Sequence, residues 1–199
     1  KIIGHRGYLE MGVENTISSL QEAAKAGADL VEIDIQQTKD GEFVVFHDKT
    51  LRRLADRDEN VYNLTLEELM DITVYSGGNS DKIPSLDQML EESKKLKVKL
   101  LIEVKTHGYE TDDLIDRLVK KLDEHHSLDI HYIQSNVYSL AVAINEYEPR
   151  LHVGTVHAVA IGNIPYYGLD FVAIEQSFVT NNLITQAKKE NIKIFVWTV

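Results

Sequence analysis

The sequence contains no cysteine, only three prolines and a deficit of positive charge. The absence of cysteine excludes disulfide bonds, thiolate metal sites and a cysteine nucleophile. With 21 Lys and Arg residues against 32 Asp and Glu residues, the net charge is −11, which disfavours non-specific binding to nucleic acid or to an anionic membrane surface. No apolar run is long enough to span a bilayer. Membrane attachment would therefore require segments outside these residues, and neither compartment nor oligomeric state follows from the composition.

The length and composition are those of a globular domain. The chain has 199 residues, 43% of them hydrophobic and 27% charged, which is enough for one domain with a substantial core. We therefore predict a single domain over residues 1–199. The chain begins at Lys1 inside an apolar strand pattern and stops inside another at Thr198-Val199. We interpret it as a piece of a longer protein, in which targeting or membrane segments would lie elsewhere.

Short β-rich runs alternate with helical patterns along the chain. The predicted strands are 1–4, 30–36, 100–105, 132–134, 151–156, 171–175 and 192–198. The predicted helices are 16–26, 112–125, 137–148 and 181–190, with two more opened by the capping boxes Thr65/Glu68 and Ser85/Gln88. Strands alternating with helices predict an α/β fold with a parallel sheet, either an open doubly wound sheet or a TIM-type (β/α)8 barrel.

The positions of the polar side chains favour the barrel. His5, the pair Glu32/Asp34, the pair Glu103/Lys105 and Trp197 all fall near the C-terminal ends of predicted strands, where barrel enzymes build their sites. An open sheet would more typically carry a glycine-rich phosphate loop after its first strand, and no such pattern follows here. We therefore predict a TIM-type barrel that stops before its eighth strand.

A tight hairpin is predicted after the second strand. Asp40-Gly41 lies between two extended runs, which indicates a two-residue turn. In that register residues whose numbers sum to 81 face each other, so Asp34 would lie opposite His47. Residues 43–46 would then form an antiparallel arm on the second strand and not a barrel strand.

Two pairs of charged residues on neighbouring strands are candidate ligands for a cation and a phosphate. Glu32 and Asp34 are two residues apart in a strand and therefore share a face. Buried together they repel each other, and a divalent ion or salt bridges to structural cations would offset that repulsion. Glu103 and Lys105 repeat the spacing: Glu103 would be a third ligand and Lys105 would reach a phosphate oxygen, or the two would form an internal ion pair.

The remaining candidates surround this cluster. Gly7 permits a turn after the first strand, and Arg6 offers a planar fork suited to phosphate or carboxylate. Glu14 would contact either the metal or Arg6. Trp197 would be either core packing or an aromatic wall for a small polyol. The histidines apart from His5 and His47 have no comparable context, and we assign them to surface or packing positions.

Taken in order, these motifs resemble those of the glycerophosphodiester phosphodiesterases. They read His5-Arg6-Gly7, Glu14-Asn15-Thr16, Glu32-Ile33-Asp34, Thr38-Lys39-Asp40-Gly41, Val44-Val45-Phe46-His47-Asp48, Pro84-Ser85-Leu86 and Glu103-Val104-Lys105, with Val196-Trp197-Thr198-Val199 similar to the family's seventh strand. The match is dense over the first 105 residues and looser beyond. The family normally continues with an eighth strand, and the short stretch between His47 and Ser85 leaves little room for the insertion that some members carry.

The resemblance implies a TIM-type barrel, a divalent metal, Ca²⁺ or Mg²⁺, and an enzyme that hydrolyses small glycerophosphodiesters. It assigns Glu32, Asp34 and Glu103 to the metal, His5 and His47 to acid–base catalysis, and Arg6 and Lys105 to the phosphate. The same site could act on a lysophospholipid or on a glycerol-phosphate polymer. A barrel that binds without catalysis is the third reading, disfavoured because every expected chemical group is present.

Overall fold

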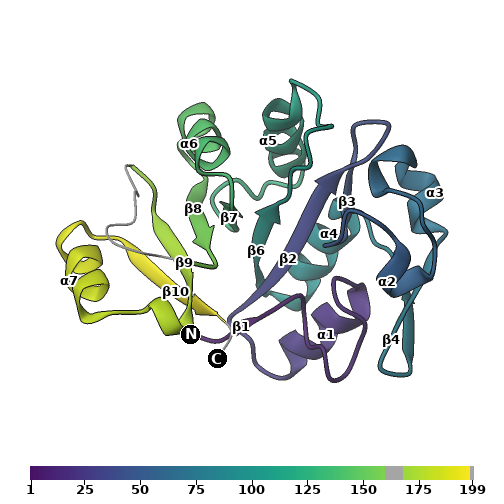
Figure 1. The fold of residues 1–199 in the computed structure, drawn as a ribbon, viewed down its shortest axis with the longest axis horizontal. Coiled ribbons are helices and arrows are strands. Elements are labelled where there is room, and N and C mark those ends of the chain that lie inside the picture. Colours follow the sequence, from purple (N-terminus) through teal and green to yellow (C-terminus); the bar gives the residue numbers. More distant parts are fainter. Residues whose placement is uncertain (160–167, 198–199) are drawn as a thin grey trace. The chain divides into compact units, whose positions relative to one another are not determined.

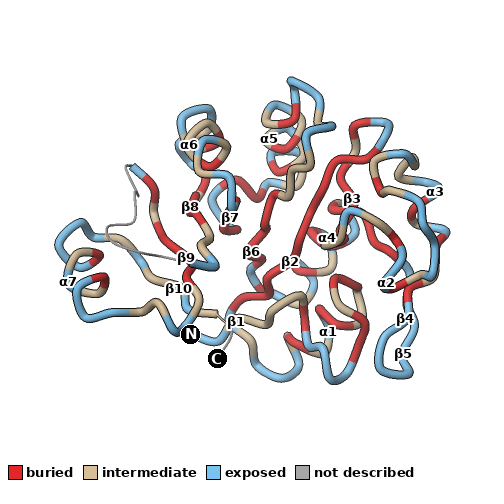
Figure 2. Tube along the Cα trace, viewed as in Figure 1, coloured by how far each residue is buried: buried red, intermediate tan, exposed pale blue. Residues whose placement is uncertain are grey.

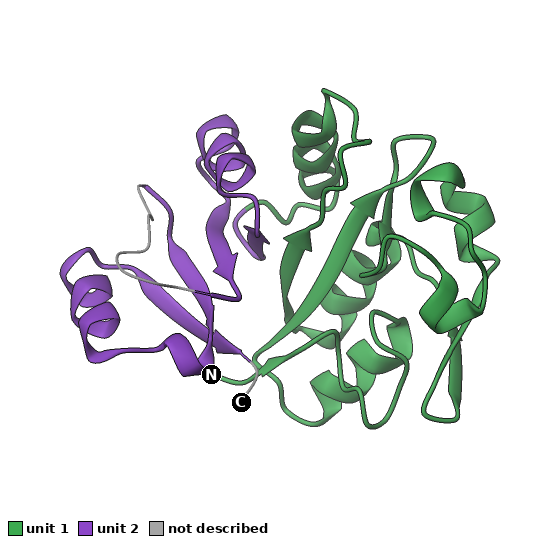
Figure 3. Ribbon diagram, in the orientation of Figure 1, with its two compact units in different colours: residues 1–128 green, residues 129–199 purple. Residues whose placement is uncertain are grey.

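The computed structural model describes residues 1–159 and 168–197. The chain divides into two compact units, residues 1–128 and 129–199 (Figure 3). Within the described residues, no helix has the length and apolar character needed to cross a membrane.

The first unit is built on a parallel sheet. Strand β1 (Ile3–Gly4) pairs with β2 (Leu30–Gln37), and β2 pairs with β6 (Lys99–Val104) (Figure 1). In the pairing of β2 with β6, Asp34 lies directly opposite Glu103. Strand β3 (Phe43–Val45) runs antiparallel to β2. The prediction that residues 43–46 form an antiparallel arm is confirmed.

Strand β2 is buried along its whole length (Figure 2). Val31, Ile33 and Ile35 on one face are fully buried, as expected for a strand of a parallel sheet covered by helices. Glu32, Asp34 and Gln36 occupy the alternate positions, so the other face of the same strand carries polar groups that are also buried. Buried polar groups require partners, and those partners form the candidate site.

Six helical segments accompany this sheet. They are α1 (Ile17–Lys25), α2 (Arg52–Ala55), a 3-10 helix (Val61–Asn63), α3 (Leu66–Met70), α4 (Leu86–Leu96) and α5 (Leu114–Glu124). The capping boxes predicted at Thr65 and Ser85 are confirmed, and Thr16 with Ser19 forms a third. A hairpin of β4 (Thr73–Ser76) and β5 (Asn79–Lys82) was not predicted, because its second strand is polar and largely exposed.

The second unit carries the other parallel strands. Its strands are β7 (Tyr132–Ser135), β8 (His152–His157), β9 (Phe171–Glu175) and β10 (Lys193–Trp197), each paired in parallel with the next. Its helices are α6 (Tyr138–Tyr147), α7 (Asn181–Lys189) and a 3-10 helix (Gln176–Phe178). All seven predicted parallel strands are present within about two residues, except that Thr198 of the last predicted strand lies outside the described residues.

The predicted register of the hairpin is wrong by one residue. The loop has three residues and not two: the Thr38 N–H donates to the Glu42 oxygen (2.9 Å), and the Gly41 N–H donates to the Thr38 oxygen (3.0 Å). Gly41 has a φ of +79°, so the loop is a turn followed by a left-handed glycine that closes a bulge. Asp34 therefore lies opposite Phe46, whose N–H donates to the Asp34 oxygen (2.9 Å). His47 is the next residue along the chain.

Candidate active site

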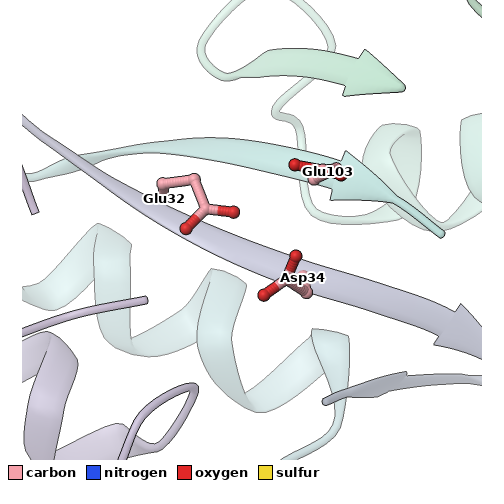
Figure 4. A group of neighbouring side chains, drawn as sticks. All are labelled: Glu32, Asp34 and Glu103. Atoms are coloured by element: carbon pink, nitrogen blue, oxygen red, sulfur yellow. The ribbon is translucent and has the colours of Figure 1, made fainter. Parts of the chain in front are cut away.

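Three buried carboxylates form the centre of the site. Glu32 and Asp34 come from β2 and Glu103 from β6, and one oxygen of each lies within 4.8 Å of the others (Figure 4). Their exposed fractions are 5%, 1% and 7%. The parallel pairing of β2 with β6 sets Asp34 beside Glu103, and the two-residue spacing along β2 adds Glu32 on the same face.

Two cations compensate the negative charge of these acids. The Arg6 Nε lies 3.3 Å from Asp34 Oδ2, and the Lys105 Nζ lies 3.2 Å from Asp34 Oδ1 and also pairs with Glu103. Burial lowers the pKa of Lys105, but the carboxylates of Asp34 and Glu103 outweigh it and raise that pKa overall. Lys105 is therefore a permanent positive charge at neutral pH. The buried Arg6 Nε makes no hydrogen bond within the described residues, although it lies beside Asp34.

The environment of Glu32 indicates that the three acids need a further cation. Burial raises the pKa of Glu32 well above its ordinary value, and the charges of Asp34 and Glu103 raise it further, against the opposing effect of Arg6. Two positive side chains thus leave part of the repulsion among three adjacent buried carboxylates uncompensated. Clustered carboxylate oxygens are the ligands of hard cations such as Mg²⁺ and Ca²⁺. The residues present therefore fit a divalent ion of this type.

Asn15 holds Asp34 in place through two hydrogen bonds, a role that we did not predict. Its Nδ2 donates to Asp34 Oδ2 (2.9 Å), and its Oδ1 accepts from the Asp34 N–H (3.0 Å). The residue is 1% exposed and adopts a left-handed conformation with φ 59°, which asparagine tolerates better than most residues. Asn15 belongs to the Glu14-Asn15-Thr16 motif, whose last residue, Thr16, caps helix α1.

His5 lies at the edge of the carboxylate cluster. Its Nε2 is 3.9 Å from Glu32 Oε2, and the side chain is 40% exposed. Burial lowers the pKa of His5, and the positive charge of Arg6 lowers it further, while Asp34 and Glu14 raise it to a smaller extent. The imidazole is therefore uncharged at neutral pH, the form that can accept a proton.

His47 is positioned by two neighbours. Its Nδ1 bonds to Asp48 Oδ1 (2.7 Å), which leaves Nε2 as the nitrogen able to exchange a proton with a ligand. The buried amide of Gln36 donates to the backbone oxygens of Phe46 (2.8 Å) and Asp48 (2.9 Å), so β2 itself holds the segment around His47. Gln36 therefore provides the link to β2 that we had attributed to a direct pairing with Asp34.

Arg53 on α2 connects the two loops that carry the histidines. It donates to Asp48 Oδ2 (2.7 Å) and to both oxygens of Glu14 (2.7 Å each), and Glu14 in turn accepts from Arg6 (3.1 Å). These bonds lower the pKa values of Glu14 and Asp48 against the raising effect of burial. Of the two alternatives for Glu14, the structure shows the contact with Arg6.

Trp197 is the predicted site residue that lies in the second unit. It occupies the last described position of β10, opposite Glu175, and its indole nitrogen is buried without a hydrogen-bond partner among the described residues. Its role in substrate binding stays a prediction. Of the other histidines, His125 pairs with Asp87 and His152 stacks on Tyr132, in agreement with surface and packing roles.

Gly7 fixes the first loop against helix α1, and its replacement is expected to destabilise the protein. It has a φ of +96°, and a Cβ there would lie 2.3 Å from Ser19 Oγ and 2.9 Å from the Ser19 backbone carbon. We expect Gly7→Ala to lower the free energy of unfolding by about 1–3 kcal/mol, measurable by urea denaturation. Gly77→Ala, where a Cβ meets nothing within 4 Å but φ is also positive, is the matched control. Equal losses in the two variants would show that the conformation matters and the contact with Ser19 does not.

Comparison with known proteins shows the family of this chain. The model of the glycerophosphoryl diester phosphodiesterase family matches residues 5–199. This chain belongs to that family. A glycerophosphodiester phosphodiesterase of Caldanaerobacter subterraneus is 30% identical over 207 residues, which cover 100% of this chain and 85% of the relative.

Solved structures of phosphodiesterases share the fold. A phosphodiesterase of Oleispira antarctica in complex with the product sn-glycerol-3-phosphate has a TM-score of 0.87 at 26% identity, covering 100% of this chain and 84% of that one. A glycerophosphodiester phosphodiesterase of Parabacteroides distasonis has a TM-score of 0.83 at 26% identity, with the same coverage. The predictions of a TIM-type α/β fold and of a phosphoric diester hydrolase are confirmed.

Proposed function

We propose that this phosphodiesterase hydrolyses glycerophosphodiesters to glycerol phosphate and an alcohol, with a divalent metal and two histidines. The observation that carries the proposal is the cluster of three buried carboxylates within 4.8 Å, with Arg6 and Lys105 paired to it and His5 beside it. The related Oleispira structure contains glycerol phosphate as the product, which supports a substrate of the same type.

Glu32, Asp34 and Glu103 would hold the ion, Ca²⁺ or Mg²⁺. Such an ion, when bound, supplies positive charge that polarises a phosphoryl oxygen and orients the substrate. Asn15 keeps Asp34 in a fixed orientation for this role, since it bonds both the backbone and the carboxylate of that residue.

The cationic side chains would bind the phosphate and stabilise the negative charge that grows during the reaction. The Arg6 Nε and the Lys105 Nζ both lie beside oxygens of Asp34, and a phosphate oxygen would replace those contacts. One imidazole would remove a proton from the attacking oxygen and the other would protonate the leaving alcohol. His47 would exchange its proton at Nε2, because Nδ1 is bonded to Asp48.

An assay with defined substrates tests the proposal. Purified protein with Mg²⁺ or Ca²⁺ should release glycerol phosphate from glycerophosphocholine or glycerophosphoglycerol. Parallel assays with a lysophospholipid and with polyglycerol phosphate address the two alternative substrate classes. Hydrolysis of none of the four would refute the proposed activity and support a barrel that binds without catalysis.

Metal binding should stabilise the protein more at high pH than at low pH. Without an ion, the raised pKa of Glu32 means that the folded protein binds its proton more tightly than the unfolded chain does. The stabilisation from that proton is complete below the unfolded pKa and is lost as the pH rises through the folded pKa. An ion needs the carboxylate and displaces the proton. The increase in Tm on adding Mg²⁺ or Ca²⁺ should therefore grow as the pH rises.

Thermal denaturation at a series of pH values, with NaCl at equal ionic strength as control, measures this effect. Glu32→Gln should remove most of the pH dependence of the metal-induced increase in Tm. A metal-induced shift in Tm that is the same at every pH, or that NaCl reproduces, would contradict a metal site at Glu32.

A further inference from the structure

An aromatic pair lies on two loops that follow the proposed catalytic residues along the chain. Tyr62, in the 3-10 helix Val61–Asn63, and Tyr109, four residues after Lys105, stack with their ring centroids 3.8 Å apart and an interplanar angle of 16°. Tyr109 is 50% exposed. Tyr62 is half-buried and supports the exposed ring of Tyr109 from one side, so the pair presents an aromatic surface to solvent.

The loop that carries Tyr109 is fixed in place. The carboxylate of Glu110 accepts hydrogen bonds from the backbone N–H groups of His107 (2.6 Å), Gly108 (2.9 Å) and Tyr109 (3.1 Å). Thr111 is bonded to Gln37 at the end of β2 through its N–H (2.8 Å) and its hydroxyl. Tyr109 is therefore presented at a defined position relative to the strands that carry the carboxylates.

Lys49 occupies the position that a cationic ligand would take on this pair. Its Nζ donates to the Tyr109 hydroxyl (3.1 Å) and lies 4.7 Å from the centre of the Tyr109 ring. A quaternary ammonium group needs an open aromatic face. Tyr62 stacks on Tyr109, and the ammonium of Lys49 already lies over its ring, so a second cation would meet both steric and electrostatic competition.

The rim formed by Lys49, Tyr62 and Tyr109 is close to the catalytic residues. Lys49 follows His47 by two residues, and the chain bends at Asp48 and Lys49. Burial lowers the pKa of His107, and among its neighbours Lys49, Lys105 and His47 lower it further, while Glu110 raises it. A single histidine thus lies within electrostatic range of the rim and of the phosphate-binding lysine.

We propose that Lys49, Tyr62 and Tyr109 contact the leaving alcohol of the substrate and select polyols, uncharged or anionic, against cationic alcohols such as choline. This inference rests on the proposed function. The alcohol is the part of the substrate that extends from the phosphate towards solvent, so it meets the groups beyond His47 and Lys105. A polyol can lay its C–H groups on a tyrosine ring and bond its hydroxyls to Lys49 and Tyr109, whereas choline is repelled by Lys49.

The test compares kcat/KM for glycerophosphoglycerol and glycerophosphocholine. The wild-type protein should prefer glycerophosphoglycerol. Lys49→Met should shift the ratio towards glycerophosphocholine by about three- to fivefold and Lys49→Glu by about tenfold, as expected for an exposed charge close to the ligand. Lys95→Met, at an exposed lysine of α4, is the matched control and should leave the ratio unchanged. Tyr109→Ala should raise KM for glycerophosphoglycerol more than it lowers kcat.

The outcomes separate this inference from the proposed function. A ratio of two substrates measured on one preparation is insensitive to partial unfolding, so a poorly folded variant still gives a valid result. Hydrolysis of both substrates with an unchanged ratio in both Lys49 variants would overturn the role of the rim alone. If the wild-type protein hydrolyses neither substrate, the proposed function fails and the inference fails with it.

Discussion

Replacing His5 or His47 by asparagine is expected to lower kcat by about 10²–10⁴-fold, the usual contribution of a positioned proton donor or acceptor. Asparagine is similar in size and keeps hydrogen-bonding groups, but it cannot carry a proton between substrate and water. His5 is beside Glu32, and His47 is fixed by Asp48, so each variant removes an imidazole that other residues hold in place. Steady-state kinetics with saturating metal measures the loss.

The control for both variants is His126→Asn. His126 is exposed and has a φ of 53°, a conformation that asparagine accepts. This variant should keep full activity and the same Tm. If both active-site variants are folded and retain activity close to that of the control, the assignment of acid–base catalysis to His5 and His47 is wrong. A loss in only one of them would leave a single-histidine mechanism.

Loss of the metal should have an effect of similar size. A Lewis-acidic ion contributes several kcal/mol of transition-state stabilisation, so a chelator should lower the rate by at least about 10²–10³-fold, and Ca²⁺ or Mg²⁺ should restore it. Glu103→Gln should act in the same direction, because it keeps the volume of a proposed ligand and removes its charge. It should also raise the metal concentration needed for half-maximal activity.

Glu67→Gln is the matched substitution outside the site, at an exposed position of α3. It should change neither the rate nor the metal requirement. Full activity in the presence of chelator, after verified removal of bound ions, would exclude the metal role of the carboxylates. If Glu103→Gln leaves the metal requirement unchanged, Glu103 is excluded as a ligand, and the assignment of Glu32 and Asp34 is unaffected.

The sequence contained the information for the strands and for the central acids. Glu32 and Asp34 share a face because the side chains of a strand alternate between its two faces. Glu103 joins them because the carboxyl ends of parallel strands meet at the same edge of the sheet. The hairpin register was not recoverable in the same way. A two-residue and a three-residue loop both suit Asp40-Gly41, and the choice depends on whether glycine is the second or the third residue of the loop.

The residues that support the site were harder to predict for another reason. Gln36 and Asn15 act through amide bonds to backbone atoms of distant segments, and a sequence pattern does not indicate the partner of an amide. Arg53 was missed because an arginine in a short exposed helix resembles a solvated surface residue. Its contacts with Glu14 and Asp48 depend on tertiary structure alone.

The proposed ion ligands, the two imidazoles and the two phosphate cations all belong to residues 1–128. The residues proposed for the reaction thus come from one continuous stretch of the chain. Three strand pairings of the described fold come after it, those of β7 with β8, β8 with β9 and β9 with β10. Mutations downstream can accumulate, or be introduced by recombination with related genes, without altering a single group assigned to bond cleavage. Divergence among relatives should therefore be faster in residues 129–199, and libraries for altered stability can be directed there.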